Sequence, residues 1–360
     1  MFNIIEKLQM NKIKLIITFI TIMLVFCSCD RKVTSDNIVA ITDMVGDTIT
    51  IGKNPKKVAC ISRTTYDLLV AFELGDKIDG AYKNIYDNPW IDVIYPNQKN
   101  EYRYEYEENY ETFLTRNIDL VFAPEKYIAD NLRSKGINAI CISLYGNPTY
   151  DDYLFFFADI IEKLWDDENI HQRVLKWKTE VNIAIQKCCV EENDTKALKK
   201  LYYVRGDKNK GIEYTDTKGS FTEFAFRKLG YEFAGKTLDT TKPSKEEICN
   251  FNPEVFVIGG IFQNSLKKKL LNDDIYINLD AIKNNKIYTI PFGLTSFEQL
   301  SITTPIFFYD MSNKLNNGSY DVKGMIKRTI NEYFKVELTD TQIDYMIAGK
   351  DPNGKDIING

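Results

Sequence analysis

The sequence predicts an α/β protein with two lobes, each built on a mostly parallel central sheet, and one long helix that joins the lobes. Strand-like and helix-like runs alternate through most of the chain, which is typical of parallel sheets covered by helices. A set of motifs in the first half recurs in the same order in the second half. Between the halves, residues 169–192 contain neither glycine nor proline. The 360 residues suit two domains of about 150 residues each.

Residues 1–29 are predicted to be a signal peptide. Lys12 and Lys14 precede a run of twelve residues, Leu15 to Phe26, that is apolar except for two threonines. A membrane span needs about 20 apolar residues, so this run is too short to span a bilayer but has the length of a signal-peptide core. Met10 is a second candidate for the start of translation.

The end of this leader, Phe26-Cys27-Ser28-Cys29, resembles a bacterial lipobox, in which the last cysteine is lipidated. Cys29 is the expected lipidation site because the small Ser28 precedes it, although Phe26 stands where leucine is more usual. Cys27 is the weaker alternative, since the bulky Phe26 precedes it. A plain signal peptide or an uncleaved anchor is the other interpretation. In each case we expect the body of the protein outside the cytoplasmic membrane, facing the periplasm or the cell exterior.

Residues 30–148 are predicted to form the N-terminal lobe. Residues 38–51 tend to alternate apolar and polar side chains around Gly46-Asp47, which predicts a β-hairpin. Four strands are predicted after the hairpin: VACIS at 58–62, IDGAY at 78–82, IDLVFAP at 118–124 and AICIS at 139–143.

Residues 149–197 are predicted to be a helical region that contains the helix between the lobes. Residues 150–165 are rich in apolar side chains and end in the acidic break 166–168, and residues 169–192 have an apolar face. At about 1.5 Å per residue, a helix of this length crosses a whole lobe. Such a helix limits movement of the lobes more than a flexible linker does. His171, near its start, is expected to be a structural or surface residue.

Residues 198–315 are predicted to form the C-terminal lobe, and residues 316–360 a helical C-terminal appendix. Within the appendix, residues 321–334 predict one helix, and Thr339-Asp340-Thr341-Gln342 resembles a capping box that opens another. The strands predicted in the C-terminal lobe are KLYYVR at 200–205, YEFAG at 231–235, EVFVIGG at 254–260 and IYTIPF at 287–292.

Recurring motifs indicate that the two lobes are copies of one α/β design. In both lobes, two lysines precede a strand that leads to an arginine, Arg63 in the first and Arg205 in the second. An Ala-Phe pair, a Leu-Gly pair and a later glycine also recur in the same order. A further set has identical spacing in both lobes: Glu111, Asn117, Asp119 and Leu120, against Glu246, Asn252, Glu254 and Val255.

Composition excludes several classes of function. The formal net charge is -5 and the chain has no basic block, which argues against nucleic acid as the main partner. The single histidine, His171, argues against imidazole-rich metal sites and His-based catalytic triads. No P-loop or dinucleotide fingerprint is present, so we expect no enzyme. The cysteines after the leader form no CxxC pair and are expected to be free, with Cys60 and Cys141 buried in strands.

Five segments, in their order and spacing, resemble the periplasmic-binding proteins for ferric siderophores, haem and cobalamin, the class with a helical backbone. The resemblance covers residues 41 to about 310 and departs from the family in the cleft loops, notably the Tyr- and Glu-rich stretch 101–110. It implies two Rossmann-like lobes bridged by one long helix, a ligand cleft between the lobes, and, in many members, a lipoprotein anchor. The segments are ITDMVGDTITIGKNPKKVACIS, AFELGDKIDG, NYETFLTRNIDLVFAP, SKEEICNFNPEVFVIGG and PFGLTSFEQLSITTPIFFYD.

Glu111 and Glu246 are the predicted docking residues. Asn109 and Ser244 can each cap a helix, which places each glutamate at the second helical position. An acidic residue there also complements the helix dipole without any docking role. The resemblance implies that one such glutamate on each lobe, just before a "PDLV"-like strand, forms a salt bridge with arginines of the permease dimer. The matching strands here begin Ile118-Asp119-Leu120-Val121 and Pro253-Glu254-Val255-Phe256, with Ile118 in place of the usual proline.

Candidate ligand-binding residues follow the predicted strands, because ligands of open α/β sheets bind beyond the carboxyl ends of the strands. Arg63, with Thr64, Thr65 and Tyr66, follows the first strand of lobe one, and Arg205 has the matching place in lobe two. Two arginines facing a cleft suit an anionic ferric complex or a carboxylate-bearing ligand; ordinary surface arginines are the alternative. Aromatic side chains near the strand ends are expected to stack on catecholate or tetrapyrrole faces, although many aromatics must be core. They are Tyr82, Trp90, Tyr127, Tyr145, Tyr214, Phe292 and Phe297.

The expected function is therefore that of a substrate-binding lipoprotein of an ABC importer, which captures an iron-siderophore-type chelate and delivers it to a permease dimer with a cytoplasmic ATPase. Haem or cobalamin is the alternative ligand, and a lipid-anchored surface structural or adhesion protein is the alternative from another class. A monomer without a cofactor is expected. Direct metal binding is disfavoured, since Glu105, Glu107 and Glu108 suit a solvated loop face.

Overall fold

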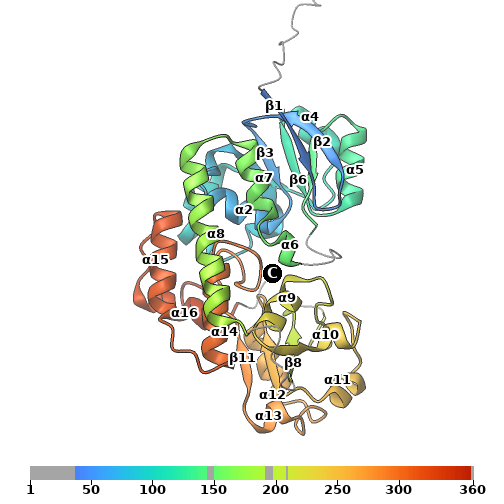
Figure 1. The fold of residues 1–360 in the computed structure, drawn as a ribbon, viewed down its shortest axis with the longest axis vertical. Helices are drawn as coiled ribbons and strands as arrows, with labels where there is room; N and C mark the ends of the chain where they lie inside the picture. The colour runs from blue at the N-terminus through green and yellow to red at the C-terminus, as the bar shows by residue number, and fades with distance from the viewer. Residues whose placement is uncertain (1–36, 144–149, 191–197, 208–209, 358–360) are drawn as a thin grey trace, which may run out of the picture. The chain divides into compact units, whose positions relative to one another are not determined.

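The computed structural model describes residues 37–143, 150–190, 198–207 and 210–357. The predicted signal peptide with Cys29, and the candidate Tyr145, lie outside these residues. From Ala40 onward the chain forms one compact unit. Two separate parallel sheets, of five and four strands, confirm the predicted α/β class with two lobes (Figure 1). None of the helices in the described ranges is long and apolar enough to cross a membrane.

The first lobe is built on a five-stranded sheet in the order β5-β4-β3-β6-β7. All neighbouring strands in it are parallel. The predicted hairpin residues form a separate two-stranded sheet of β1 (Ile38–Thr42) and β2 (Thr48–Gly52). The five strands are β3 (Val58–Cys60), β4 (Ile78–Tyr82), β5 (Tyr102–Tyr104), β6 (Leu120–Ala123) and β7 (Ala139–Cys141). The helices of this lobe are α2 (Arg63–Ala71), α3 (Ile91–Ile94), α4 (Tyr110–Thr115) and α5 (Lys126–Ser134).

Strand β5 takes up part of the stretch 101–110, which the resemblance placed in the cleft loops, while residues 105–109 lie in no strand or helix. Tyr104 is fully buried, stacks on Phe113 with 4.9 Å between ring centroids, and donates a hydrogen bond of 2.6 Å to Asp79. The backbone of β5 approaches β4 closely at Gly80, where an added Cβ would lie 2.0 Å from the Tyr102 carbonyl oxygen. The sequence analysis did not predict this edge strand, because polar residues surround it and its buried contacts are made by tyrosines.

The second lobe is built on a four-stranded parallel sheet in the order β11-β10-β8-β9. Each strand lies within a predicted strand or extends it by one residue. The strands are β8 (Lys199–Val204), β9 (Tyr231–Phe233), β10 (Val255–Ile258) and β11 (Ile287–Thr289). The helices around it are α9 (Phe221–Lys228), α10 (Ala234–Thr237), α11 (Lys245–Phe251), α12 (Gln263–Leu271) and α13 (Asp280–Lys283).

Equivalent hydrogen bonds tie the first strand of each lobe to the segment before its partner strand. In lobe one, the Lys57 amide donates to Asp119 Oδ2 over 2.9 Å, and the Asp119 amide donates back to the Lys57 carbonyl. In lobe two, the Lys200 amide donates to Glu254 Oε1 over 3.2 Å, and the Glu254 amide donates back to the Lys200 carbonyl. The spacing that recurs in the sequence therefore corresponds to the same local structure in both lobes.

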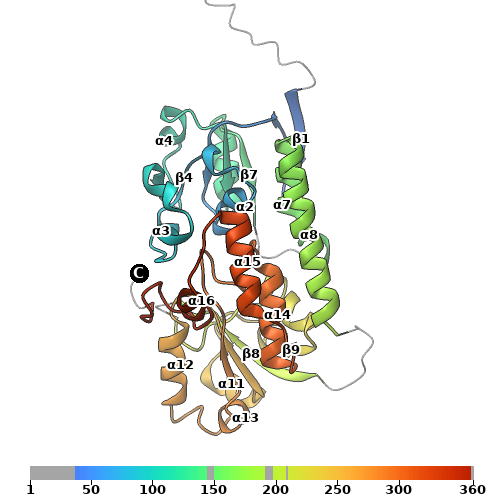
Figure 2. The same ribbon diagram turned by 90° about the vertical axis from the view of Figure 1, so that its left-hand side faces the viewer.

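Helix α8 (Glu168–Cys188) is the predicted long helix, with 21 residues, and it follows α6 (Tyr150–Tyr153) and α7 (Phe156–Leu164). Asp167 caps its N-terminus, where the aspartate side chain accepts from two backbone amides, and the helix ends four residues earlier than predicted. Figures 1 and 2 show α8 running from α7 beside lobe one down to α14 (Thr304–Leu315) beside lobe two. Trp177 anchors it, fully buried, with its indole N–H donating to the Ser301 carbonyl over 3.2 Å.

The C-terminal appendix contains the two predicted helices, α15 (Val322–Phe334) and α16 (Asp340–Ile347), and α16 has the predicted capping box of Thr339 and Gln342. The segment after α16 contacts both lobes. The indole N–H of Trp90, next to α3, donates to the Lys350 carbonyl over 2.8 Å, and Asn264 of α12 donates to the Ala348 carbonyl over 3.1 Å. The predicted domain boundaries themselves stay predictions.

Candidate functional site

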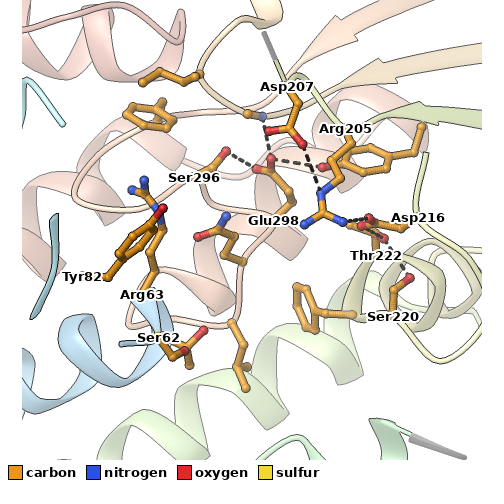
Figure 3. A pocket seen from close by; sticks show the side chains of 18 of the residues that line it. Ser62, Arg63, Tyr82, Arg205, Asp207, Asp216, Ser220, Thr222, Ser296 and Glu298 are labelled. Carbon is orange, nitrogen blue, oxygen red and sulfur yellow. Dashed lines mark hydrogen bonds and ion pairs between the residues drawn. The ribbon is translucent and has the colours of Figure 1, made fainter. Parts of the chain in front are cut away.

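A pocket of about 340 Å³ is lined by residues of both lobes. Its walls come from the ends of β3 and β4 in lobe one, from the ends of β8 and β10 in lobe two, from the start of α9, and from residues 292–300 before α14. This position, beyond the carboxyl ends of parallel strands, is where open α/β sheets bind ligands. Figure 3 shows Arg63 and Tyr82 on one side of the pocket, and Arg205 with Asp207 and Asp216 on the other.

Four of the sequence-predicted ligand residues line this pocket: Arg63, Tyr82, Arg205 and Phe292. The structure brings them together from segments more than 200 residues apart in the chain. Thr64, named with Arg63 in the sequence, lines it as well. Their role in ligand binding stays a prediction.

Four other candidates lie in the core and not in the pocket wall. Thr65 donates to the Ser62 carbonyl over 2.7 Å, and Tyr66 packs edge-on against the rings of Tyr86 and Tyr95. Both belong to α2, which begins at Arg63, and the helix turns them away from the cavity. Trp90 and Phe297 have 0% exposed surface. These large side chains fill the interior, where apolar burial is most favourable.

Tyr127 and Tyr214 also lie outside the pocket lining. Tyr127 is on α5, 54% exposed, and its hydroxyl donates to Glu107 over 2.6 Å. Tyr214 is nearly buried and packs against an arginine, with the Arg205 guanidinium carbon 5.4 Å from its ring centroid. Tyr214 therefore supports a lining residue instead of facing the cavity.

Arg63 is the first residue of α2 and the only basic residue of lobe one among the described lining residues. Its Nη2 donates to the Asn84 carbonyl over 2.7 Å, and no carboxylate in the described part of the chain forms an ion pair with it. Burial lowers the pKa of its guanidinium, while Asp87 and Asp207 act on it only as more distant negative charges. Arg63 therefore remains available to an anionic or carbonyl oxygen of a ligand.

Arg205 is in a different electrostatic situation. Its Nη1 lies 3.2 Å from Asp216 Oδ1, and its Nε lies 3.8 Å from Asp207 Oδ2. Asp216 also accepts a hydrogen bond of 2.8 Å from Thr222 at the start of α9. Burial raises the pKa of Asp216, and the nearby Arg205 opposes that rise. The charge of Arg205 is therefore largely compensated within its own lobe.

Glu298 is a buried carboxyl group in the pocket lining that the sequence analysis missed. Its Oε1 accepts from the Gly260 amide over 2.6 Å and from the Tyr203 hydroxyl over 3.2 Å, and its Oε2 accepts from Ser296. Burial raises its pKa despite these donors. The sequence feature that could have indicated this site is the Gly259-Gly260 pair after β10. A side chain at Gly259 would collide with the carboxyl group, because an added Cβ would lie 2.2 Å from Glu298 Oε1.

Other lining residues missed by the sequence analysis include several aromatic and polar side chains. The polar ones lie in the loop between β8 and α9 or at the start of α9 and belong to no motif, and the aromatic ones resemble core residues in the sequence. They are Tyr106, Tyr150, Tyr203, Asp207, Asp216, Ser220, Phe221 and Thr222.

The two predicted docking glutamates are at the second positions of their helices, as expected. Asn109 caps α4, accepting from the Glu111 amide over 3.0 Å, and Ser244 caps α11 ahead of Glu246. Both glutamates are exposed, and neither forms an ion pair with any described residue. Figures 1 and 2 show α4 and α11 on different lobes. The docking role stays a prediction.

The described residues contain no group of three or more His, Cys, Asp or Glu side chains that could hold a metal ion. His171 pairs with Glu162 over 2.6 Å on the surface of α8. Cys60 and Cys141 are free and buried, as predicted.

The chain matches no protein-family model. It matches no curated protein sequence either. Among solved structures, it is similar to a periplasmic solute-binding protein from Veillonella parvula, with 20% identity over 88% of this chain and 99% of that one, and a TM-score of 0.65.

Two further structures share the fold. One is a molybdate periplasmic binding protein from Haemophilus influenzae, with 16% identity over 84% of this chain and 99% of that one, and a TM-score of 0.67. The other belongs to an Fe3+-hydroxamate transport system from Saccharomonospora viridis, with 15% identity over 77% of this chain and 98% of that one, and a TM-score of 0.59. The chain therefore has the fold of periplasmic solute-binding proteins of ABC transporters.

Proposed function

We propose, from a fold shared with periplasmic solute-binding proteins, that this chain is the substrate-binding component of an ABC importer. It is exported, anchored outside the cytoplasmic membrane through a lipid on Cys29, and captures an iron-siderophore-type chelate. The observation that carries the proposal is the pocket between the strand ends of both lobes, where Arg63 faces a wall of polar and aromatic side chains.

The lining supports a ligand with an organic shell. Tyr82 and Tyr106 pack edge-on with 5.5 Å between ring centroids in lobe one. Tyr150 and Phe221 do so at 5.7 Å on the opposite side. Flat aromatic side chains offer a large contact area at a small entropic cost, while a few polar groups set the orientation of the ligand.

Delivery uses the two glutamates. Glu111 and Glu246 are exposed, unpaired among the described residues, and carried by equivalent capped helices on the two lobes. In this proposal each one forms a salt bridge with an arginine of a permease dimer, whose cytoplasmic ATPase supplies the energy. A pair of equivalent contacts on two lobes suits a two-fold symmetric partner.

Haem or cobalamin is the second candidate ligand within the same architecture. The cavity of about 340 Å³ is at the small end of the range of about 300–1,000 Å³ seen for ligand pockets. A corrinoid would therefore remain largely outside the walls, which favours a more compact chelate. A surface structural or adhesion protein, the candidate from another class, would not need this pocket.

The test is direct binding to the mature chain without residues 1–29. Native mass spectrometry and calorimetry are used with a ferric tris-hydroxamate, a ferric tris-catecholate, haem, cobalamin, molybdate and bare Fe3+. We expect one-to-one binding of at least one ferric chelate with a Kd of about 1 μM or lower, equivalent to about 8 kcal/mol. Binding of molybdate or haem alone, or of nothing, would overturn the proposed ligand.

A further inference from the structure

The charges that line the pocket nearly cancel. Within the described ranges, the charged lining residues are Arg63, Arg205, Asp207, Asp216 and Glu298. Two guanidinium groups therefore stand against three carboxyl groups. The lining has a net charge of −1 when all five groups are ionised and of zero when Glu298 carries a proton.

Two helices add partial positive charge. Helix α2 begins at Arg63 and α9 begins at Phe221, both in the pocket lining. A helix N-terminus is equivalent to about half a positive charge. With both included, the described part of the pocket offers between about zero and about one net positive charge to a ligand.

The remaining charge is unevenly distributed between the two walls. On the lobe-one wall, Arg63 is positive and has no carboxylate partner among the described residues. On the lobe-two wall, Arg205 is compensated by Asp216 at 3.2 Å and Asp207 at 3.8 Å. Asp207 has 49% of its side chain exposed and is accessible to a ligand, although Lys210 Nζ also lies 4.0 Å from its Oδ2.

We propose that the ligand is a ferric chelate with at most one net negative charge and an uncharged metal-binding core of the tris-hydroxamate type. An oxygen of the chelate lies against Arg63, and N–H or O–H donors of its backbone or terminal group face Asp207 and the lobe-two wall. This inference rests on the proposed function and names the chemical class of its ligand.

A trianionic chelate does not fit this charge distribution. Each hydroxamate carries one negative charge, so three of them neutralise Fe3+, whereas three catecholates, with two charges each, leave a trianion. A trianion in this pocket would meet one guanidinium without a carboxylate partner among the described residues. On the lobe-two wall it would meet three carboxyl groups, two of which are paired with Arg205 or Lys210. Like charges forced together in a partly desolvated site cost several kcal/mol.

Three ferric chelates test the proposal on the mature chain by calorimetry at two salt concentrations. They are a linear tris-hydroxamate with a terminal ammonium group, the same molecule with that amine succinylated to end in a carboxylate, and a tris-catecholate. We expect both hydroxamates to bind at least about tenfold more tightly than the catecholate, a difference of about 1.4 kcal/mol. Catecholate binding as tight as that of the hydroxamates would overturn this inference and leave the proposed function standing.

The variant Asp207→Asn separates charge from shape. Removing this carboxylate should weaken binding of the ammonium-bearing chelate and strengthen binding of the carboxylate-bearing one, so that the ratio of the two affinities shifts about threefold or more toward the anion. The matched control is Asp344→Asn in α16, an exposed carboxylate paired with Lys323 and absent from the lining.

An Asp207→Asn variant with an unchanged ratio would overturn the inference, as would an equal shift in Asp344→Asn. If none of the three ferric chelates binds to the correctly folded chain, the proposed function itself fails, and the two failures are thereby distinguished.

Discussion

The guanidinium of Arg205 lies 3.2 Å from the carboxylate of Asp216, whereas Arg63 on the other lobe has only a backbone carbonyl as hydrogen-bond partner among the described residues. Two arginines that occupy equivalent places in the repeated sequence therefore have different electrostatic roles. Arg205 belongs to an ion-pair cluster that holds its own wall together. Arg63 keeps a charge that no carboxylate among the described residues pairs with, as the proposed ligand contact requires.

Asp216→Asn should destabilise the protein, because it removes the partner of Arg205 in a buried cluster. The carboxylate of Asp216 accepts hydrogen bonds from Arg205 and from Thr222. In the asparagine variant one of these oxygens is replaced by an NH2 group, and the other no longer carries a negative charge. We expect a loss of about 1–3 kcal/mol in the free energy of unfolding, measured by urea denaturation. Asp344→Asn, which affects only an exposed pair, should change it by less than about 0.5 kcal/mol. Equal losses in the two variants would contradict this account.

Asp67→Asn should change the pH dependence of stability. Asp67 is buried in α2 and accepts from the Ile302 amide over 2.8 Å, and burial raises its pKa to about 7. The folded state then binds more protons than the unfolded state between about pH 4 and pH 7, so this group lowers the free energy of unfolding as pH rises through that window. Below about pH 4 Asp67 is protonated in both states and does not change the free energy of unfolding with pH. Above about pH 7 it is ionised in both states, and the decrease in the free energy of unfolding is complete.

The measurement for Asp67 is urea unfolding at pH 5 and pH 8. The asparagine keeps an acceptor for Ile302 but cannot ionise, so the variant should gain on the order of 1–3 kcal/mol relative to the wild type between the two pH values. The same difference between variant and wild type at both pH values would mean that Asp67 is already ionised in the folded state at pH 5, and would contradict this account.

Alanine at both Glu111 and Glu246 should abolish uptake and leave ligand affinity intact. Both carboxylates are exposed and lie outside the pocket lining. Ligand affinity is measured by calorimetry, and uptake with the cognate permease in vesicles. Glu337→Ala, at another exposed glutamate without an ion pair among the described residues, should have no effect on uptake. A loss of ligand affinity in the double variant would contradict a docking role.

Trp90→Phe should loosen the segment after α16. The substitution removes the hydrogen bond of 2.8 Å to the Lys350 carbonyl and should cost about 1–2 kcal/mol. Hydrogen exchange of residues 348–357 should increase. Trp165→Phe is a matched control, because its indole N–H donates to the Pro55 carbonyl within lobe one over 3.2 Å. This control should lose similar stability, while the protection of residues 348–357 from hydrogen exchange stays unchanged. If that protection falls in both variants, the Trp90 hydrogen bond does not specifically hold this segment.

Cys29→Ala should release the protein from the membrane fraction without changing its affinity for ligand. A lipid chain on this cysteine is what holds the protein at the bilayer in the proposed function. Radiolabelled palmitate should label the wild type and the Cys27→Ala control but not Cys29→Ala. Labelling of Cys29→Ala, or its loss in Cys27→Ala, would place the lipid elsewhere.

Local signals in the sequence were sufficient for most of the fold. The apolar runs around Val58, Leu120 and Val255 became parallel strands, and the Thr339 to Gln342 capping box begins α16. Strand β5 was missed because its evidence is not local. Tyr104 stacks on Phe113 and donates a hydrogen bond to Asp79, which lie nine and 25 residues away in the chain.

Taken alone, the sequence determined the α/β class, the repeat of the two lobes, the long helix and the capped positions of Glu111 and Glu246, because each depends on periodicity or on residues within one turn of a helix. Only the tertiary structure decided which candidates line the pocket. Tyr82 and Phe292 reach it, while Trp90 and Phe297 pack inside, since burial of an aromatic side chain depends on distant segments. The charge available to a ligand was decided in the same way, by the pairing of Arg205 with Asp216 and the absence of such a partner for Arg63 among the described residues.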